Sequence, residues 1–320
     1  FLHIGASIAI KQEIATEQSF AIEFQQDLAK EFTKHLPFEL TDGQRKSAWQ
    51  ILHDLEQSHP MNRLLEGDVG SGKTVVAALA ALMVIRAGYQ VAIMVPTDIL
   101  ARQHIESFRK LLQPWAIQSE LLTSKLPVAR KQDVRARLAL GDIKLVVGTQ
   151  ALLTKDTEFA GLGLVVVDEQ HRFGVNQRLT LKDKAGRLPH VLTMTATPIP
   201  RSLALVVYGD LDISRITELP AGRKPVKTKV VFDDDRQMVY NQVDDLIKAG
   251  QQVYIVCPAI DESDAGGMKA ASAEYKRLQN SVFAHRRIGL VHGKLKPDEK
   301  AAVMEQFVAG EIDILVPTAG

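Results

Sequence analysis

The segment Gly67-Asp-Val-Gly-Ser-Gly-Lys-Thr74 has the composition and spacing of a phosphate-binding loop, G-x-x-x-x-G-K-[ST]. Residues 61–66 predict a strand leading into it, and Val75 to Arg86 predict a helix that begins directly after it. In such a loop the backbone N–H groups point at phosphate oxygens, and the helix dipole favours negative charge there. Lys73 would reach the β- and γ-phosphates, and the Thr74 hydroxyl would ligate Mg²⁺. The alternative is a glycine-rich turn that binds nothing.

A second set of reactive groups follows an apolar run. The residues from Leu162 to Val167 are apolar, and Asp168 and Glu169 come directly after them. Such runs are typical of parallel strands covered on both faces, and ligands in open α/β sheets bind at the carboxyl ends of strands. Asp168 can hold Mg²⁺ through its water shell, and Glu169 is placed to orient or deprotonate the attacking water. A strand that merely ends in solvated acids is the alternative.

Together the two segments predict a site that hydrolyses a nucleotide. Its catalytic residues would be Lys73, Asp168 and Glu169, and its metal ligands Thr74 and Asp168. The predicted contacts to the nucleotide are Gly67, Gly70, Ser71, Gly72, Lys73, Thr74 and Val75.

The sequence around these acids resembles a known family. Asp168-Glu-Gln-His-Arg-Phe-Gly174 is similar to motif II of the RecG-type DNA helicases of superfamily 2. The likeness continues through Met194–Leu205, Glu218–Pro225 and Gly289–Pro297, and covers roughly residues 36 to 316. The transcription-repair coupling translocases share much of this core, but their motif II tends to read Asp-Glu-Glu-Gln. The resemblance implies an ATP-dependent translocase with Mg²⁺ that remodels branched double-stranded DNA and contacts a single-strand-binding protein.

Gln44 has two interpretations. Thr41 and Gln44 form the pattern of a capping box at a helix start, which alone can explain them. The segment Phe38-Glu-Leu-Thr-Asp-Gly-Gln44 also resembles the Q motif, whose glutamine reads the adenine edge. An amide can donate to N7 and accept from the N6 amino group, which would favour ATP over GTP.

Three segments resemble the DNA contacts of the same family. Val95-Pro-Thr-Asp98 is similar to motif Ia and Val147-Gly-Thr149 to motif Ib, while Val291-His-Gly293 lies in the second half. A helix start after Thr97 suits a DNA phosphate, although Thr97 or Asp98 would cap that helix whatever it binds. The resemblance thus gives as DNA contacts Pro96, Thr97, Gly148, Thr149, His292 and Gly293.

Four residues are expected to couple nucleotide and DNA. His171 lies beside Glu169, and motif III follows the next expected strand. The alternative for the threonines is that their hydroxyls satisfy local backbone groups, because Thr before Pro198 is a common turn arrangement. The expected coupling residues are His171, Thr195, Thr197 and Arg201.

Composition leaves the partner open. The 320 residues carry 39 Lys and Arg against 38 Asp and Glu, a net charge of +1, so bulk charge argues neither for nor against DNA. Cys257 is the one cysteine, which excludes an intrachain disulfide and fits a reducing compartment. The longest apolar run, Val75 to Ile85, is too short to span a bilayer. We expect a bacterial cytoplasmic protein at the nucleoid, whose first residues are a cut beginning rather than a signal peptide.

Alternating strand and helix signals predict an α/β fold of two RecA-like domains with parallel sheets, the second incomplete. Strands are expected at 62–66, 91–95, 118–122, 143–148, 163–168 and 190–194, then at 226–231, 252–257, 287–291 and 312–316. Helices are expected at 44–57, 73–87, 98–112, 127–140, 199–207, 235–249, 268–279 and 297–308. We predict a helical connector (1–38), an ATP-binding domain (39–218), a hinge (219–225) and a partial second domain (226–320).

The end of the chain departs from the family pattern. Pro317 does not fit motif V, so Thr318 is either its threonine or a residue beyond a gap. Motif VI, with its arginine finger, is missing, so the segment alone should bind nucleotide and hydrolyse it weakly.

Overall fold

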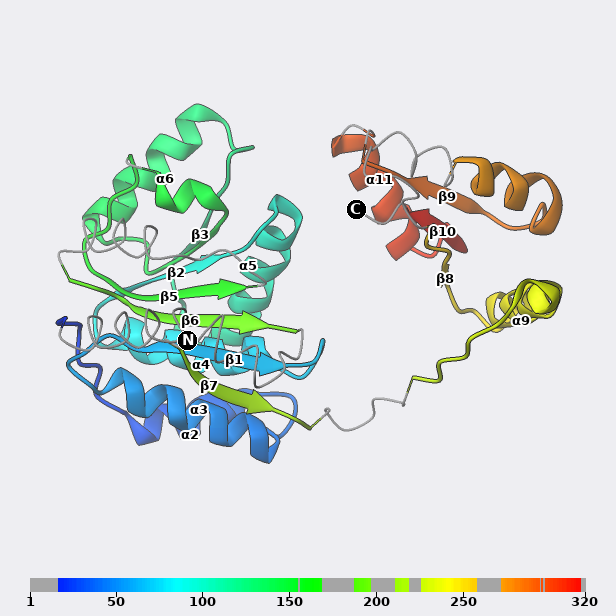
Figure 1. Cartoon of the computed structure of the whole chain (residues 1–320). Helices are drawn as coiled ribbons and strands as arrows, with labels where there is room; N and C mark the ends of the chain where they lie inside the picture. The colour runs from blue at the N-terminus through cyan, green and yellow to red at the C-terminus, as the bar shows by residue number, and fades with distance from the viewer. Residues whose placement is uncertain are drawn as a thin grey trace, which may run out of the picture. The chain divides into compact units, whose positions relative to one another are not determined.

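The computed structural model describes residues 17–154, 156–168, 187–196, 211–218, 226–257, 272–293, 295 and 297–317 (Figure 1). The chain divides into two compact units, residues 1–224 and 225–320. The predicted limits of the connector and of the hinge stay predictions.

The first unit is built on a seven-stranded sheet in the order β3-β4-β2-β5-β6-β1-β7. Every neighbouring pair in it is parallel. Its strands are β1 (Asn62–Gly67), β2 (Gln90–Met94), β3 (Ser119–Leu122), β4 (Leu145–Gly148), β5 (Leu162–Asp168), β6 (His190–Thr195) and β7 (Asp212–Ile216). The predicted fold class, α/β with parallel RecA-like sheets, is confirmed.

Alternate residues of the central strands pack into two different cores. Val91 and Ile93 of β2 belong to the larger core, whereas Ala92 and Met94 belong to the smaller one. The larger core includes residues of helices α2 (Gln26–His35), α3 (Asp42–Leu55), α4 (Lys73–Arg86) and α5 (Asp98–Leu112), and the smaller includes residues of α6 (Val128–Leu140). Burial on both faces is the reason that these strands read as continuous apolar runs.

Helix α4 is buried all round. Every residue from Val75 to Ile85 is buried, and the helix contacts α2, α3, α5 and three central strands. A helix without a polar face needs cover on every side, which explains the long apolar run. The loop before α4 therefore begins an element fixed in the core.

The chain before α2 is held against the sheet by His190 at the start of β6. Nδ1 of His190 accepts a hydrogen bond from the Met61 backbone N–H at 3.0 Å, and Nε2 lies 2.6 Å from the Phe20 carbonyl oxygen. These partners require the neutral ring with its proton on Nε2. Burial lowers the pKa of His190 from its ordinary 6.5 to about 4, so the ring stays neutral in the folded chain at neutral pH.

The second unit contains a three-stranded parallel sheet in the order β8-β10-β9. Its strands are β8 (Val253–Tyr254), β9 (Ile288–Val291) and β10 (Ile314–Pro317), and its helices include α9 (Arg236–Lys248) and α11 (Pro297–Val308). Cys257 is buried with Ile314 and Val316 in its core, as expected for a core thiol.

Two expectations about strands were wrong. Residues 226–231 form no strand, and Val226 and Val230 are exposed, because this β-branched segment has no neighbouring strand within the described part of the chain. Strand β7 was missed, since its sequence Asp-Ile-Ser-Arg-Ile alternates weakly and only two of its five residues are buried. The helix expected at 199–207 lies outside the described residues.

No helix in the ranges that the structure describes is long and apolar enough to cross a bilayer.

Candidate functional site

The loop between β1 and α4 requires glycine at two positions. Gly72, which precedes α4, has a left-handed backbone with φ of 86°. A Cβ at Gly72 would lie 2.3 Å from Nε2 of Gln44, and a Cβ at Gly67 would lie 2.5 Å from Oγ of Ser71. Glycine avoids both the strained backbone and these close approaches. The loop can therefore close tightly over the N-terminus of α4, as a phosphate cradle must.

Polar groups of this loop fit an anion. Nζ of Lys73 donates hydrogen bonds to the carbonyl oxygens of Gly67 at 2.7 Å and of Asp68 at 3.1 Å, so the ammonium group lies over the loop. Oγ of Ser71 is buried and has no hydrogen-bond partner among the described residues. The first turn of α4 contains no acidic residue that would offset the helix dipole. This donor set fits a nucleotide phosphate.

Asp168, Thr195 and Gly67 lie along one edge of the sheet. Strand β6 lies between β1 and β5, and its Met194 and Thr195 are level with Asp168 and Glu66 respectively. Since neighbouring strands are about 4.8 Å apart, roughly 10 Å separates Asp168 from the start of the loop. A hydrated Mg²⁺ with phosphate oxygens can span such a gap, and Thr74 and Asp168 are the residues that would hold it.

Four predicted residues cannot be placed at this edge. Glu169, His171, Thr197 and Arg201 lie outside the described residues, so their roles stay predictions. Thr195 is described and is buried at the end of β6.

Gln44 contacts both the start of α3 and the phosphate loop. Its Oε1 accepts a hydrogen bond from the Thr41 backbone N–H at 2.9 Å, and the Thr41 hydroxyl accepts from the Gln44 backbone N–H at 3.3 Å. This is the predicted capping box. In addition, Nε2 of Gln44 donates to the Ser71 carbonyl oxygen at 2.8 Å. The capping interpretation is confirmed, while adenine reading stays a prediction.

A basic hollow lies beside the start of α5. It has a volume of about 940 Å³, and its lining includes Pro96, Thr97 and Thr149, which were predicted as DNA contacts, together with Lys125, Lys131 and Arg135. Thr97 is the N-cap of α5, since its hydroxyl accepts from the Leu100 backbone N–H at 3.3 Å. Gly148 ends β4 directly before Thr149. Motifs Ia and Ib thus lie at one hollow, with three cations that sequence reasoning missed.

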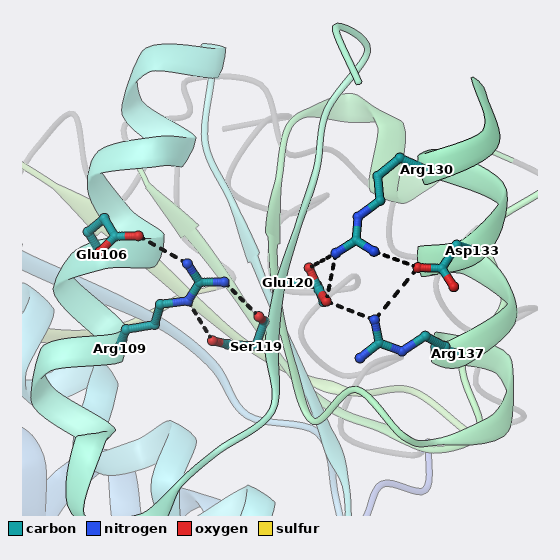
Figure 2. Close-up of polar contacts among 7 residues, drawn as sticks. All are labelled: Glu106, Arg109, Ser119, Glu120, Arg130, Asp133 and Arg137. Atoms are coloured by element: carbon teal, nitrogen blue, oxygen red, sulfur yellow. Dashed lines mark hydrogen bonds and ion pairs between the residues drawn. The ribbon is translucent and has the colours of Figure 1, made fainter. Parts of the chain in front are cut away.

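Figure 2 shows the two arginines of α6 that do not line the hollow, Arg130 and Arg137, bound to acidic side chains. Arg130 and Arg137 lie on one face of α6 and bind Glu120 of β3, with shortest distances of 2.9 and 2.8 Å. Lys131 and Arg135 are four residues apart and therefore share the adjacent face, which lines the hollow. Their spacing on a predicted helix is the signal that could have identified them.

Figure 2 also shows that β3, at the edge of the sheet, is held from both sides. Arg109 of α5 donates to the Ser119 hydroxyl at 3.0 Å and to the Ser119 carbonyl oxygen at 2.9 Å. Glu120, the next residue, binds α6 instead. These contacts tie both α5 and α6 to β3.

Asp98 is the acidic residue that lines this hollow. Burial raises the pKa of its carboxyl, but hydrogen bonds from Thr123 and Arg102 outweigh it and hold that pKa below its ordinary value. Asp98 is therefore ionised, and Arg102 pairs with it at 3.0 Å. Arg135 pairs with the exposed Asp156 at 3.3 Å, and Nζ of Lys131 donates to the Ser124 carbonyl oxygen at 3.2 Å. A polyanion in the hollow would compete with Asp156 for Arg135.

The predicted DNA contacts of the second unit follow β9. His292 is half-buried, and its Nδ1 has no hydrogen-bond partner within the part of the chain that the structure describes. Its carbonyl oxygen accepts from the Leu295 backbone N–H at 3.1 Å. Gly293 is exposed, and a Cβ there would meet nothing within 4 Å. The surroundings of Gly293 thus give no steric reason for glycine.

A phosphate loop and an aspartate at the ends of parallel strands, with a basic hollow beside them, define a nucleotide-binding α/β protein of the helicase type. The model of the DEAD/DEAH box helicases matches residues 41–206. The chain is 47% identical over 319 residues to the ATP-dependent DNA helicase RecG of Aquifex aeolicus, covering 99% of this chain and 40% of that protein. It is 46% identical over 308 residues to RecG of Bacillus subtilis, covering 96% of this chain and 45% of that protein.

Solved structures agree with this class. A structure of RecG bound to a three-way DNA junction superposes with a TM-score of 0.82 at 40% identity, over 99% of this chain and 42% of that one. Yeast Dbp5 bound to RNA and ADP BeF3 superposes with a TM-score of 0.63 at 18% identity, over 94% and 76% of the two chains, which shows the fold alone.

The chain belongs to the DEAD/DEAH box helicase family. The similarity to RecG helicases confirms the resemblance predicted from the sequence. The chain spans about two fifths of the length of these relatives.

Proposed function

We propose that this chain is the motor core of an ATP-dependent DNA translocase that remodels branched DNA such as replication forks and Holliday junctions. The observation that carries the proposal is that a phosphate loop and a basic hollow for nucleic acid occur on one sheet. The similarity to RecG helicases, one of them bound to a three-way junction, supports branched DNA as the substrate.

In this proposal the phosphate loop holds ATP, and Thr74 and Asp168 hold Mg²⁺. The metal supplies charge neutralisation on the phosphates when bound. Lys73 contacts the β- and γ-phosphates, and Glu169 orients or deprotonates the attacking water.

Thr97, Thr149 and the cations of the basic hollow would take successive phosphates of one DNA strand. Such contacts position DNA without reading its sequence, as a translocase requires. His292 and Gly293 would contact DNA from the second unit. We further propose action in the bacterial cytoplasm at the nucleoid, with contact to a single-strand-binding protein.

The ATPase rate of the full-length protein tests this function. We expect hydrolysis to be stimulated most by fork DNA, less by linear duplex, and least without DNA. Lys73→Ala serves as the inactive control. Binding of ATP and DNA without stimulated turnover would instead indicate a nucleotide-gated DNA-binding module. Equal stimulation by linear duplex and fork, in a protein with an upstream RNA-polymerase-binding domain, would favour a transcription-repair coupling translocase.

A second experiment tests the basic hollow. Lys131→Ala should weaken fork binding and lower the slope of log affinity against log salt concentration by about one, since one phosphate contact is lost. Lys110→Ala removes an exposed lysine of α5 that does not line the hollow and is the matched control. Equal slopes for both variants and the wild type would remove Lys131 from the interface.

A further inference from the structure

His104 of α5 makes a contact that the roles above do not use. Its Nε2 lies 2.7 Å from Oδ2 of Asp168, and each of the two side chains is only 12% exposed. We propose that His104 is a positioning residue, which orients Asp168 for the metal and ties α5 to the nucleotide site. This inference rests on the proposed function, in which Asp168 holds Mg²⁺.

The contact with His104 occupies one of the two carboxylate oxygens of Asp168. A carboxylate at the end of a strand can rotate about its Cβ–Cγ bond, and Mg²⁺ tolerates little deviation from octahedral geometry. A hydrogen bond from Nε2 to Oδ2 fixes that rotation and leaves Oδ1 for the water shell of the metal. Outer contacts of this kind commonly orient metal-binding groups.

The ring itself is held in place. The Phe108 ring, one turn further along α5, lies 6.4 Å from the His104 ring between centroids. Nδ1 of His104 is buried without a hydrogen-bond partner in the described ranges. The short contact directs the Nε2 N–H of His104 at Asp168.

Helix α5 carries the contact to the DNA side. It begins after Thr97 at the basic hollow, and His104 follows Thr97 by seven residues, close to two helical turns or about 10.5 Å. Thr97 and His104 therefore lie on nearly the same face of one rigid helix. A phosphate that shifts the start of α5 would shift Nε2 of His104, and with it the Asp168 carboxylate.

The test compares two variants in the full-length protein. His104→Gln places an amide N–H close to the position of Nε2, whereas His104→Leu fills the site without a donor. The affinity for Mn²⁺, with saturating ATPγS, is measured from the electron paramagnetic resonance signal of the free ion, with and without fork DNA. Nucleotide affinity in EDTA reports whether each variant retains its folded site.

We expect His104→Leu to raise the Kd for Mn²⁺ by roughly 10-fold, the lower end for loss of an outer contact, while His104→Gln stays close to the wild type. Nucleotide affinity in EDTA should be the same in all three proteins. Fork DNA should change the Mn²⁺ Kd of the wild type and of His104→Gln, and leave that of His104→Leu unchanged.

Three results would overturn the inference. These are an unaltered Mn²⁺ Kd in His104→Leu, equal losses in both variants, and a wild-type Kd that does not respond to fork DNA. A wild-type protein that binds Mn²⁺ with nucleotide but hydrolyses no ATP would refute the proposed function instead, and the Mn²⁺ measurements would still decide the role of His104.

Discussion

Replacement of Gln44 by alanine should weaken both the fold and the preference for ATP. The Gln44 side chain is only 2% exposed and fills its place with two hydrogen bonds, one to the Thr41 backbone N–H and one to the Ser71 carbonyl oxygen. A backbone donor and a backbone acceptor determine which end of the amide is which, so its orientation is settled by chemistry. One N–H and one lone pair of the amide are left for an adenine edge.

The size of the effect follows from these partners. Alanine leaves the Thr41 N–H and the Ser71 oxygen unpaired in a nearly buried place, and each such loss costs about 1–3 kcal/mol. We expect a total of about 2–6 kcal/mol, which at about 2–4 °C per kcal/mol for a unit of this size lowers the unfolding midpoint by roughly 4–24 °C. If the amide also reads adenine, the variant loses discrimination worth about 1–3 kcal/mol, so the ratio of GTP to ATP dissociation constants should fall by roughly 10-fold.

Calorimetry with ATP and GTP and thermal unfolding of the first unit measure the two effects separately. Gln44→Glu keeps the acceptor for Thr41 but sets a carboxylate oxygen against the Ser71 carbonyl oxygen, so it should be at least as destabilising as Gln44→Ala. An unchanged midpoint in Gln44→Ala would refute the energetic reasoning. Equal weakening of both nucleotides would show that Gln44 is a structural link between α3 and the phosphate loop and reads no base.

Four further outcomes are expected. Lys73→Ala should abolish tight ATP binding, and unchanged calorimetric affinity at fixed Mg²⁺ would contradict the phosphate-loop assignment. Glu169→Gln should keep ATP–Mg²⁺ binding and slow hydrolysis by about 10²–10⁴-fold, so turnover within twofold of the wild type would exclude it as the base. Thr195→Ala with Thr197→Ala should raise the ATP consumed per base pair unwound, whereas a parallel loss of stability and all activities would indicate a local structural role. The pKa of His190 is about 4 in the folded chain and 6.5 in the unfolded chain. Between these values the unfolded chain binds one more proton than the folded chain, so stability falls as pH drops. The free energy of unfolding should therefore fall between pH 7 and pH 5 by about 2 kcal/mol more in the wild type than in His190→Gln.

The sequence predicted most of the first unit because its local signals agree with its packing. The five strands between the two edge strands are almost entirely buried, and the apolar runs of β2, β4 and β5 leave little ambiguity about where they lie. Helix α4 and the phosphate loop were found at nearly the observed positions, since glycines and a buried helix impose strong patterns. The edge strand β7 was missed because half-exposed residues carry a weak period-two signal.

The second unit shows the limit of propensity. From Val226 to Val230 β-branched residues alternate with lysine, which favours a strand, yet a strand needs a partner and none is found among the described residues. β-Propensity measures how well a residue suits a paired, half-buried surface. Pairing partners distant in the chain are not visible in six residues.

The contacts between distant segments were the part that local patterns could not provide. Gln44 and Ser71 are 27 residues apart, and His104 and Asp168 are 64 apart, so no spacing rule relates them. Each pair connects a helix to the edge of the sheet where the nucleotide site lies. Gln44 connects α3 to the phosphate loop, and His104 connects α5 to the end of β5. The motifs predicted which side chains belong to the candidate site. The parallel strand order β2-β5-β6-β1 determines which of these side chains lie close together, because it places the carboxyl ends of β5, β6 and β1 side by side. The arrangement predicts that coupling between DNA and ATP depends on the helix α5 as much as on motif III, which the His104 variants and the threonine double variant can separate.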